Sequence, residues 1–539
     1  MKRFLIIISI FTATNLFAQD VKTNEVFDAM QQEMKRTMTL SKTEPKIHFA
    51  AFKVTDAAEL SIIAARGGIA QQNQIHKIFT DVALRVGNNK EDNSFFEAVT
   101  YNQSTIQNGG LSPETVRAGL WAASDVSYKK ALDIYSRKQG YKNKKSAEEI
   151  FDDFSNITPV QDVKTYEKIP FPIDTLREIA QKTSAAGALK ELEKFNTQVD
   201  IIEEISYYLS NEGAKYTRQD LIVQINFYAK SRTKNGFEFD DIKSLTYASL
   251  KDIPSLTVLE NIAHDFAKQT AAFTEAKKGT AFIGPVWLSG EASARMFENT
   301  FIKNMNNTRK IIFDAGNGKF QYALGEFTLK ENLKVLPVNF DVIDDPLQEE
   351  FNGQKMLGAY KVDDEGAKAE TLALVKNGIL KNLPKTRALI KNQTKTNGHA
   401  FVNWGQDLYA KAGVKNLFFF PHETTPIEDF KQKFMDYCKA EGLEYCYKIS
   451  SRNVAGKSDV LAIKIDANTG EETPIYGLNA PTLNSRTLRD IKFAADDLTL
   501  YNIPAGVSYV VPSVILSEVE LTPSQVYPTT KMLVTRPNI

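Results

Sequence analysis

The sequence predicts an α+β protein of two mixed α/β domains, an N-terminal domain of sheet and helices and a C-terminal domain rich in strands. Two observations predict this class. The chain has 539 residues, of which 42% are hydrophobic and 24% charged, an ordinary globular composition that is long enough for two or three domains. Amphipathic helices and strand-like runs share the first half, whereas strand-like runs dominate the second half. We place the boundary near residues 275–285, which gives domains at 19–280 and 281–539.

Residues 1–18 have the features of a secretory signal peptide. Lys2 and Arg3 form the basic start, and the segment from Phe4 to Phe11 is apolar. We expect cleavage after Ala18, and the alternative is a retained, uncleaved anchor. The apolar run is too short for a stable membrane span, and no cysteine follows it for attachment of a lipid. We therefore expect the mature protein to be periplasmic or secreted.

The charge balance gives no support for nucleic acid as a partner. The chain has 66 basic and 66 acidic residues, so its formal net charge is zero. A nucleic-acid or anionic-membrane partner usually leaves an excess of lysine and arginine. No later stretch approaches the ~20 apolar residues of a membrane helix, so we expect no membrane span after signal cleavage.

The first elements of the mature chain are a helix and a strand meander. The helix spans about 24–40, where a stripe of apolar side chains recurs every four residues. Two strand-like runs follow at 47–54 and 58–65, separated by a turn at Thr55-Asp56. Gly67-Gly68 marks the next turn, and a further strand covers 77–86. The apolar stripe should pack in the core; it consists of Val26, Met30, Met34 and Met38.

Helices and strands alternate up to the boundary. Ser112-Pro113 is a strong helix start, with serine at the N-cap and proline at the first helical position. His264 lies in the last helix of this domain, where a lone histidine is usually solvated. The expected helices span 113–138, 174–196 and 255–278, and the expected strands span 199–209, 218–228 and 244–249.

The stretch from Thr280 to Glu298 is the most informative part of the chain. It predicts a short apolar strand, a tight turn at Ser289-Gly290 and then a helix. Glu291 falls in the first turn of that helix, where a carboxylate is favoured by the helix dipole. One interpretation is a plain helix cap with Ser289 or Gly290 at the N-cap. The other is that Glu291 is the remnant of a metal site.

The C-terminal half offers an acidic cluster and a cysteine pair. Asp363-Asp364-Glu365 invites a divalent metal, since carboxylates suit hard cations, but we expect a solvated acidic turn. Asn377-Gly378 predicts a hairpin turn after a strand at 372–375. Further elements are a strand at 418–421, a helix from Thr425-Pro426 to about 439 and a strand at 443–449. Cys438 and Cys446 form either a disulfide or two buried apolar cysteines.

The central stretch resembles the core segment of the TldD/TldE family (TldE is also called PmbA), the "modulator of gyrase" group of peptidases. In the catalytic TldD members this helix carries an H-E-x-x-x-H zinc motif. The matching run keeps Glu291 but has Gly290 and Arg295 in place of the two histidines. Glycine has no side chain and arginine stays protonated, so neither can bind zinc. The resemblance is therefore to the TldE-like half of the family, which lacks the motif.

Other segments carry the same resemblance. Asp363 to Gly366 matches a D-x-E-G signature of the family, and the strand near Pro512 covers the place where TldD members have a cysteine ligand, which is absent here. Lys395 to His399 is similar to a short loop near the family's active cleft. His399 is expected to be a loop residue rather than a ligand. The resemblance thus makes these residues candidates for a peptide groove: Asp364, Glu365, Asn397, Gly398 and His399.

The resemblance implies a zinc-less, TldE-like subunit of an exported metallopeptidase complex that degrades unfolded peptides. In this interpretation the chain binds no cofactor itself, and a TldD-like catalytic subunit in a heterodimer or larger assembly supplies the zinc. One alternative is a non-catalytic envelope protein that binds peptides or serves assembly. Another is a stand-alone metallopeptidase in which Glu291 acts as general base with unconventional ligands such as His264 or His399.

Overall fold

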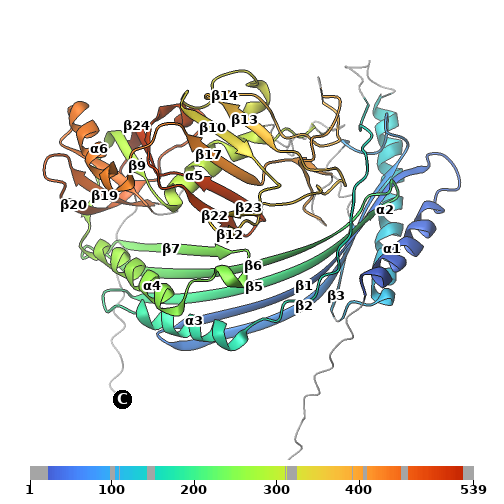
Figure 1. Cartoon of the computed structure of the whole chain (residues 1–539), viewed down its shortest axis with the longest axis horizontal. Helices are drawn as coiled ribbons and strands as arrows, with labels where there is room; N and C mark the ends of the chain where they lie inside the picture. The colour runs from blue at the N-terminus through green and yellow to red at the C-terminus, as the bar shows by residue number, and fades with distance from the viewer. Residues whose placement is uncertain are drawn as a thin grey trace, which may run out of the picture.

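The computed structural model describes residues 22–96, 103–108, 110–142, 152–309, 311, 325–390, 393–404, 409–450 and 459–525. The expected signal peptide lies outside the described residues. The N-terminal half forms one long, curved sheet, and the C-terminal half lies on its concave side (Figure 1). This arrangement of mixed sheets and helices confirms the predicted fold class.

The N-terminal sheet has seven strands in the order β3-β2-β1-β5-β6, with β4 and β7 both paired to β6. Except for the parallel pairing of β4 with β6, neighbouring strands run antiparallel, and β1 pairs with β5 without a register shift from Ala51↔Ser210 to Ala65↔Asn196. The strands are β1 (Ile47–Ala65), β2 (Gly68–Val86), β3 (Gln103–Asn108), β4 (Gln161–Asp162), β5 (Lys194–Ser210), β6 (Lys215–Arg232) and β7 (Glu238–Tyr247).

Four helices cover the convex face of this sheet (Figure 1). At one end, α1 (Thr23–Met38) and α2 (Pro113–Lys142) pack on residues such as Phe52 of β1. At the other end, α3 (Ile173–Ala186) and α4 (Leu256–Ala271) pack on residues such as Leu60 of the same strand. Side chains alternate between the faces of a strand, so the residues between these apolar positions point toward the C-terminal half.

Three expectations for this half are wrong. No turn interrupts β1 at Thr55-Asp56, because the buried Asp56 carboxylate is stabilised inside the strand by His76 Nε2 at 2.5 Å and Lys168 Nζ at 2.9 Å. The helix expected over 174–196 ends at Ala186, and β5 has already begun at Lys194. The helix expected over 255–278 ends at Ala271, because Lys277 and Lys278 pair as a short strand with a distant part of the chain. The first helix and the Ser112 N-cap agree with the sequence, and the Ser112 hydroxyl accepts the Thr115 N–H at 3.1 Å. The strand expected over 244–249 is present but begins earlier and ends at Tyr247.

The C-terminal half contains two larger sheets. One has the order β21-β24-β9-β18-β19-β20-β8 and the other the order β14-β13-β10-β17-β23-β22. Their strands are β8 (Lys277–Lys278), β9 (Phe282–Leu288), β10 (Phe340–Asp344), β13 (Leu372–Lys376), β14 (Ile379–Leu380), β17 (Asn416–Pro421), β18 (Tyr445–Ile449), β19 (Asp459–Asp466), β20 (Glu472–Asn479), β21 (Ile491–Ala494), β22 (Thr499–Ile503), β23 (Val507–Val511) and β24 (Val514–Leu521).

Helices α5 (Glu291–Thr300) and α6 (Ile427–Ala440) complete the C-terminal core. Phe297 of α5 packs on Phe419 of β17 with ring centroids 4.3 Å apart. Two small hairpins are β11 (Glu350–Phe351) with β12 (Gln354–Lys355) and β15 (Ala400–Phe401) with β16 (Lys411–Ala412). Short 3-10 turns are η1 (Leu250–Asp252), η2 (Ala272–Glu275), η3 (Ile302–Met305), η4 (Glu326–Leu329) and η6 (Thr487–Asp490).

Local sequence signals hold well in this half. Asn377 and Gly378 both have positive φ, at 50° and 73°, and join β13 to β14 as the hairpin rule requires. Cys438 of α6 and Cys446 of β18 form a disulfide, which settles the alternative left open by the sequence. Within the described ranges, no helix is both long enough and apolar enough to cross a membrane.

Candidate functional site

The strand-turn-helix unit predicted around Gly290 is present. Strand β9 ends at Leu288, Gly290 adopts a φ of 57°, and α5 begins at Glu291 with Gly290 as its N-cap. A glycine suits this position because L side chains rarely adopt a positive φ. A Cβ atom at residue 290 would lie 3.8 Å from the Tyr501 hydroxyl of β22.

Glu291 connects the two halves of the molecule. Its Oε1 atom accepts a hydrogen bond from the backbone N–H of Ser244 on β7 at 3.1 Å. Burial raises the pKa of the neighbouring Tyr501, and the Glu291 charge adds to this effect. The carboxylate therefore lies where α5, the edge strand of the N-terminal sheet and β22 meet.

Arg295 is occupied by an ion pair on its own helix. Its Nη1 atom lies 2.6 Å from Glu298 Oε2, one helical turn further on. Between the two motif ends, the Ser293 hydroxyl donates to the Pro512 carbonyl at 2.6 Å. The helix thus packs against the strand junction where the family resemblance would place a cysteine ligand.

These residues do not fit a zinc ion. A glycine, a paired guanidinium and one carboxylate held by a backbone N–H do not supply the three or four ligands that zinc takes. Among the described residues, no group of three or more histidine, cysteine, aspartate or glutamate side chains lies close enough together to hold a metal ion. The structure thus does not bring His264 or His399 together with Glu291.

The acidic cluster is buried, so the expectation of a solvated turn is wrong. The Asp363 carboxylate accepts backbone N–H groups of Glu365, Ala367 and Ala400 at 3.0, 2.9 and 3.1 Å. Burial, followed by the Glu365 charge, raises the pKa of Asp363 to about 8 against these donors. These three hydrogen bonds hold the backbone of the turn in place, so the Asp363 carboxylate has a structural role.

Glu365 belongs to a buried ionic network between the two halves. Its Oε2 atom accepts the backbone N–H of Arg387 at 2.9 Å, and Arg85 of β2 lies 3.5 Å from Oε1. Arg387 in turn forms a bidentate pair with Glu212, at the turn between β5 and β6. These cations explain how a cluster of acids is tolerated inside the protein. Glu365 therefore contributes to the contact between the N-terminal and C-terminal halves.

The second part of the loop at 395–399 is also buried, from Asn397 to His399, whereas Lys395 is exposed. Asn397 Oδ1 accepts the backbone N–H of Lys385 at 2.7 Å, and a Cβ atom at Gly398 would lie 2.1 Å from the Lys368 carbonyl oxygen. His399 is fully buried, with Nε2 3.1 Å from Asp344 Oδ2. His264 lies on α4, on the opposite face of the N-terminal sheet (Figure 1). Of the five groove candidates, Asp364 and Glu365 line cavities, and only Asp364 lines the two-chambered cleft described next.

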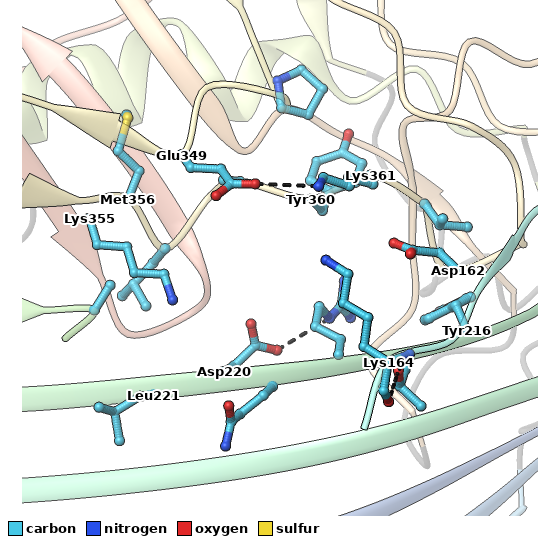
Figure 2. A pocket seen from close by; sticks show the side chains of 18 of the residues that line it. Asp162, Lys164, Tyr216, Asp220, Leu221, Glu349, Lys355, Met356, Tyr360 and Lys361 are labelled. Atoms are coloured by element: carbon cyan, nitrogen blue, oxygen red, sulfur yellow. Dashed lines mark hydrogen bonds and ion pairs between the residues drawn. The ribbon is translucent and has the colours of Figure 1, made fainter. Parts of the chain in front are cut away.

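A cleft with two chambers lies between the concave face of the N-terminal sheet and loops of the C-terminal half. The large chamber has a volume of about 620 Å³ and the small chamber about 270 Å³. Figure 2 shows Lys164 reaching into the small chamber, with Tyr360 on the C-terminal side and Asp220 on the sheet side. The residues shared by both chambers are Arg218, Asp220, Leu357, Ala359 and Tyr360. We call these joined chambers the interdomain cleft.

Arg218 of β6 organises the charges of the interdomain cleft. Its Nε atom lies 3.2 Å from Asp220 Oδ2, and its Nη2 atom lies 3.2 Å from Asp364 Oδ1. The other oxygen of Asp364 accepts the Val402 N–H at 2.9 Å. Burial would raise the pKa of Asp364, but Arg218 and nearby lysines hold it below its usual value. The Asp364 carboxylate is therefore ionised, and both acids are already in contact with Arg218 in the wall of the cleft.

Apart from Asp364, sequence reasoning missed the residues that line the cleft. Arg218 and Asp220 lie within a strand whose apolar positions, such as Val223 and Ile225, face the helices. The alternating polar positions were a usable signal for a second, functional face of the sheet. The loops of the opposite wall give no such signal, because only the tertiary fold brings them over β6.

Comparison with known proteins places these features in a family context. Residues 283–443 match the PmbA/TldA metallopeptidase C-terminal domain. This segment includes most of β9, all of α5 and the acidic turn. No curated protein matches the chain.

Solved structures with the same fold cover nearly the whole chain. TldE from Thermococcus kodakarensis has 13% identity and a TM-score of 0.60, covering 92% of this chain and 100% of that chain. A proposed modulator of a DNA gyrase from Thermotoga maritima has 14% identity and a TM-score of 0.59 with the same coverage. A proposed modulator of DNA gyrase from Bacteroides thetaiotaomicron has 12% identity and a TM-score of 0.59, covering 93% of this chain and 99% of that chain. At these identities the likeness shows the fold alone.

Proposed function

We propose that this chain is an exported, TldE-like member of the PmbA/TldD family that works as the zinc-less subunit of a metallopeptidase. A TldD-like catalytic partner holds the zinc ion, and the present chain forms part of the path along which an unfolded peptide approaches it. The observation that carries the proposal is the state of the motif helix. Gly290 and Arg295 stand at the two histidine positions, and Arg295 is engaged by Glu298.

The geometry around Glu291 supports a structural use of the one acid that is kept. A metallopeptidase base has to be free to receive a proton from zinc-bound water. Here Glu291 accepts the Ser244 N–H and ties α5 to the edge of the N-terminal sheet. Helix α5 therefore connects the two halves of this chain, while the partner carries out catalysis.

The interdomain cleft supports a role in peptide binding. Its two chambers share five lining residues, two of them on β6. The small chamber extends toward β4 and the large chamber extends over β5 and β1, which provides an elongated rather than a round site. Polar side chains and apolar side chains both line it, as is usual for sites that hold a flexible ligand in a defined direction. An extended peptide suits such a site better than a compact small molecule.

Reconstitution with a partner tests this function. The mature chain is purified with and without a co-expressed TldD-like protein that has an intact H-E-x-x-x-H motif, and cleavage of an unfolded, fluorescently quenched casein is followed. We expect activity only in the complex, and its loss when the motif glutamate of the partner is changed to glutamine. Glu291→Gln in the present chain is the matched control and should leave the activity of the complex within a few-fold. Cleavage by the present chain alone contradicts the proposal.

Export is tested separately. The full chain is expressed in a Gram-negative host, and the N-terminus of the protein from the periplasmic fraction is sequenced. We expect the mature chain to begin at Gln19. Recovery of the intact N-terminus from the cytoplasm would remove export from the proposal and leave the subunit assignment standing.

A further inference from the structure

The large chamber of the interdomain cleft carries an excess of positive charge. Four basic residues line it and three acidic residues oppose them: Lys53, Arg218, Lys411 and Lys415 against Glu204, Asp220 and Asp364. Two of the acids, Asp220 and Asp364, are already paired with Arg218. The lining therefore carries one more positive than negative charge.

Lys53 and Lys415 approach the chamber from opposite walls. Lys53 lies on β1, on the concave face of the N-terminal sheet, and Lys415 lies between β16 and β17 of the C-terminal half. Among the described residues, neither lysine forms an ion pair with a carboxylate. The Lys415 ammonium lies 4.0 Å from the centre of the Phe401 ring, a weak substitute for an anion.

Lys415 is buried among charged groups of both signs. Burial lowers the pKa of Lys415 to about 8, and repulsion by Arg218 and Lys53 adds to this, while Asp364 and Asp220 oppose it. Three cations thus face one another in a partly dehydrated chamber. An anion bound among them would relieve this repulsion and favour the charged form of Lys415.

The walls of the chamber favour an organic anion over an inorganic one. Apolar side chains line it beside the lysines, namely Ile202, Ile222, Leu357, Phe401 and Pro504. A volume of about 620 Å³ holds a side chain as well as a carboxylate. The small chamber continues from it past Arg218 and Tyr360, so that the chain preceding a terminal residue has room to extend.

From these observations we propose that the large chamber binds the C-terminal carboxylate of a peptide between the ammonium groups of Lys53 and Lys415. The apolar walls hold the side chain of the last residue, and the preceding residues run into the small chamber. This inference rests on the proposed role in peptide binding and deepens it. It gives the peptide a direction, with the carboxyl end anchored in this chain.

Peptide binding to the isolated mature chain, without partner or zinc, tests the proposal. The probe is a hexapeptide of alanine, serine and a terminal leucine, labelled with fluorescein at its N-terminus, and fluorescence anisotropy reports the Kd. It is compared with the same peptide carrying a C-terminal amide, and with an amidated peptide that carries an internal glutamate. We expect the free acid to bind at least tenfold more tightly than either amidated peptide at pH 7.

Variants assign the effect to the two lysines. Lys415→Met and Lys53→Met should each reduce the ratio of amide Kd to acid Kd to below about threefold, whereas Lys415→Arg should keep most of it. Lys439→Met is the matched control, because Lys439 is an exposed lysine of α6 that lines neither chamber. It should leave the ratio unchanged. Far-ultraviolet circular dichroism and thermal unfolding check that each variant is folded.

Three outcomes overturn the inference. Equal binding of acid and amide removes the carboxylate site, and equal binding of the glutamate peptide assigns the anion to a side chain instead of the chain end. Absence of binding by all three peptides removes the site altogether. None of these results affects the test of the catalytic partner, which uses proteolysis by the complex, so the two failures are distinguishable.

Discussion

Glu291 on α5 and Ser244 on β7 form a direct link between the two halves of the protein, with the Ser244 N–H donating to the Glu291 carboxylate over 3.1 Å. Strand β7 is an edge strand, and its outward N–H groups need acceptors from elsewhere. The acid that remains from the zinc motif thus satisfies a donor of the N-terminal sheet. This relationship offers a physical reason for keeping a glutamate in a helix without the histidines.

Replacing Glu291 should change stability rather than metal content. Glu291→Ala removes the acceptor of the Ser244 N–H, and we expect a loss of about 1 kcal/mol in the free energy of unfolding. Glu291→Gln keeps an oxygen acceptor and should lose less than half of that. Urea unfolding followed by tryptophan fluorescence measures both. Equal destabilisation by the two variants would mean that the carboxylate charge, and not the hydrogen bond, matters.

The ion pair between Arg218 and Asp364 in the interdomain cleft should contribute to the stability of the protein. Arg218→Met leaves the buried Asp364 carboxylate without its cation, and breaking a buried pair in this way costs about 3 kcal/mol of unfolding free energy. The double variant Arg218→Met with Asp364→Asn should recover at least 1 kcal/mol, since the unpaired charge is gone. Urea unfolding of the two single variants and the double variant gives the coupling. Additive effects would show that the two side chains do not interact.

The buried pair of His399 and Asp344 should make stability depend on pH. Burial acts to lower the pKa of His399, but the Asp344 carboxylate and the more distant Asp363 outweigh it, so the folded-state pKa lies above the ordinary value of 6.5. The stabilisation is complete below about pH 6.5 and is lost as the pH rises through the folded-state pKa.

Asp344→Asn provides the comparison for this pH effect. The amide keeps an oxygen for the Asn416 N–H, which Asp344 Oδ1 accepts at 2.7 Å, but removes the charge opposite His399. The stability difference between wild type and variant, measured by urea unfolding from pH 5.5 to 9, should shrink as the pH rises. A difference that stays constant from pH 5.5 to 9 would show that His399 is neutral throughout and would contradict this prediction.

The disulfide should stabilise the C-terminal half. Cys438 and Cys446 close a loop with a sequence separation of 8, and loop-closure entropy for a loop of this size corresponds to about 2.5 kcal/mol. The double variant Cys438→Ala with Cys446→Ala should lower the free energy of unfolding by roughly that amount. The control is the wild-type protein, unfolded once with the disulfide intact and once after reduction. An unchanged unfolding midpoint after reduction would show that the disulfide does not stabilise the protein and would contradict this prediction.

Features set by nearby residues were predictable from the sequence, whereas features set by distant partners were not. The Ser112 cap and the Asn377-Gly378 hairpin depend on backbone preferences within a few residues, and both appear as expected. Asp56 was expected in a turn, yet it lies inside a strand because Lys168, more than a hundred positions away, offsets its charge. Local patterns do not reveal such a partner.

The site shows the same division. The strand-turn-helix unit around Gly290 follows from local signals, and so does the absence of histidine at the motif positions. The acidic turn was expected in solvent because Arg85 and Arg218, which neutralise Glu365 and Asp364, come from strands of the other half. The interdomain cleft exists only once β6 and the C-terminal loops are brought together.

The most direct test of the central claim is the zinc content of the purified mature chain, measured by inductively coupled plasma mass spectrometry after dialysis against zinc and then against buffer. The account predicts much less than one zinc per chain for the protein alone. It predicts about one zinc per heterodimer once a partner with an intact motif is bound, since zinc needs three or four protein ligands and this chain lacks them. One zinc per chain in the isolated protein, lost on Glu291→Ala, would contradict it.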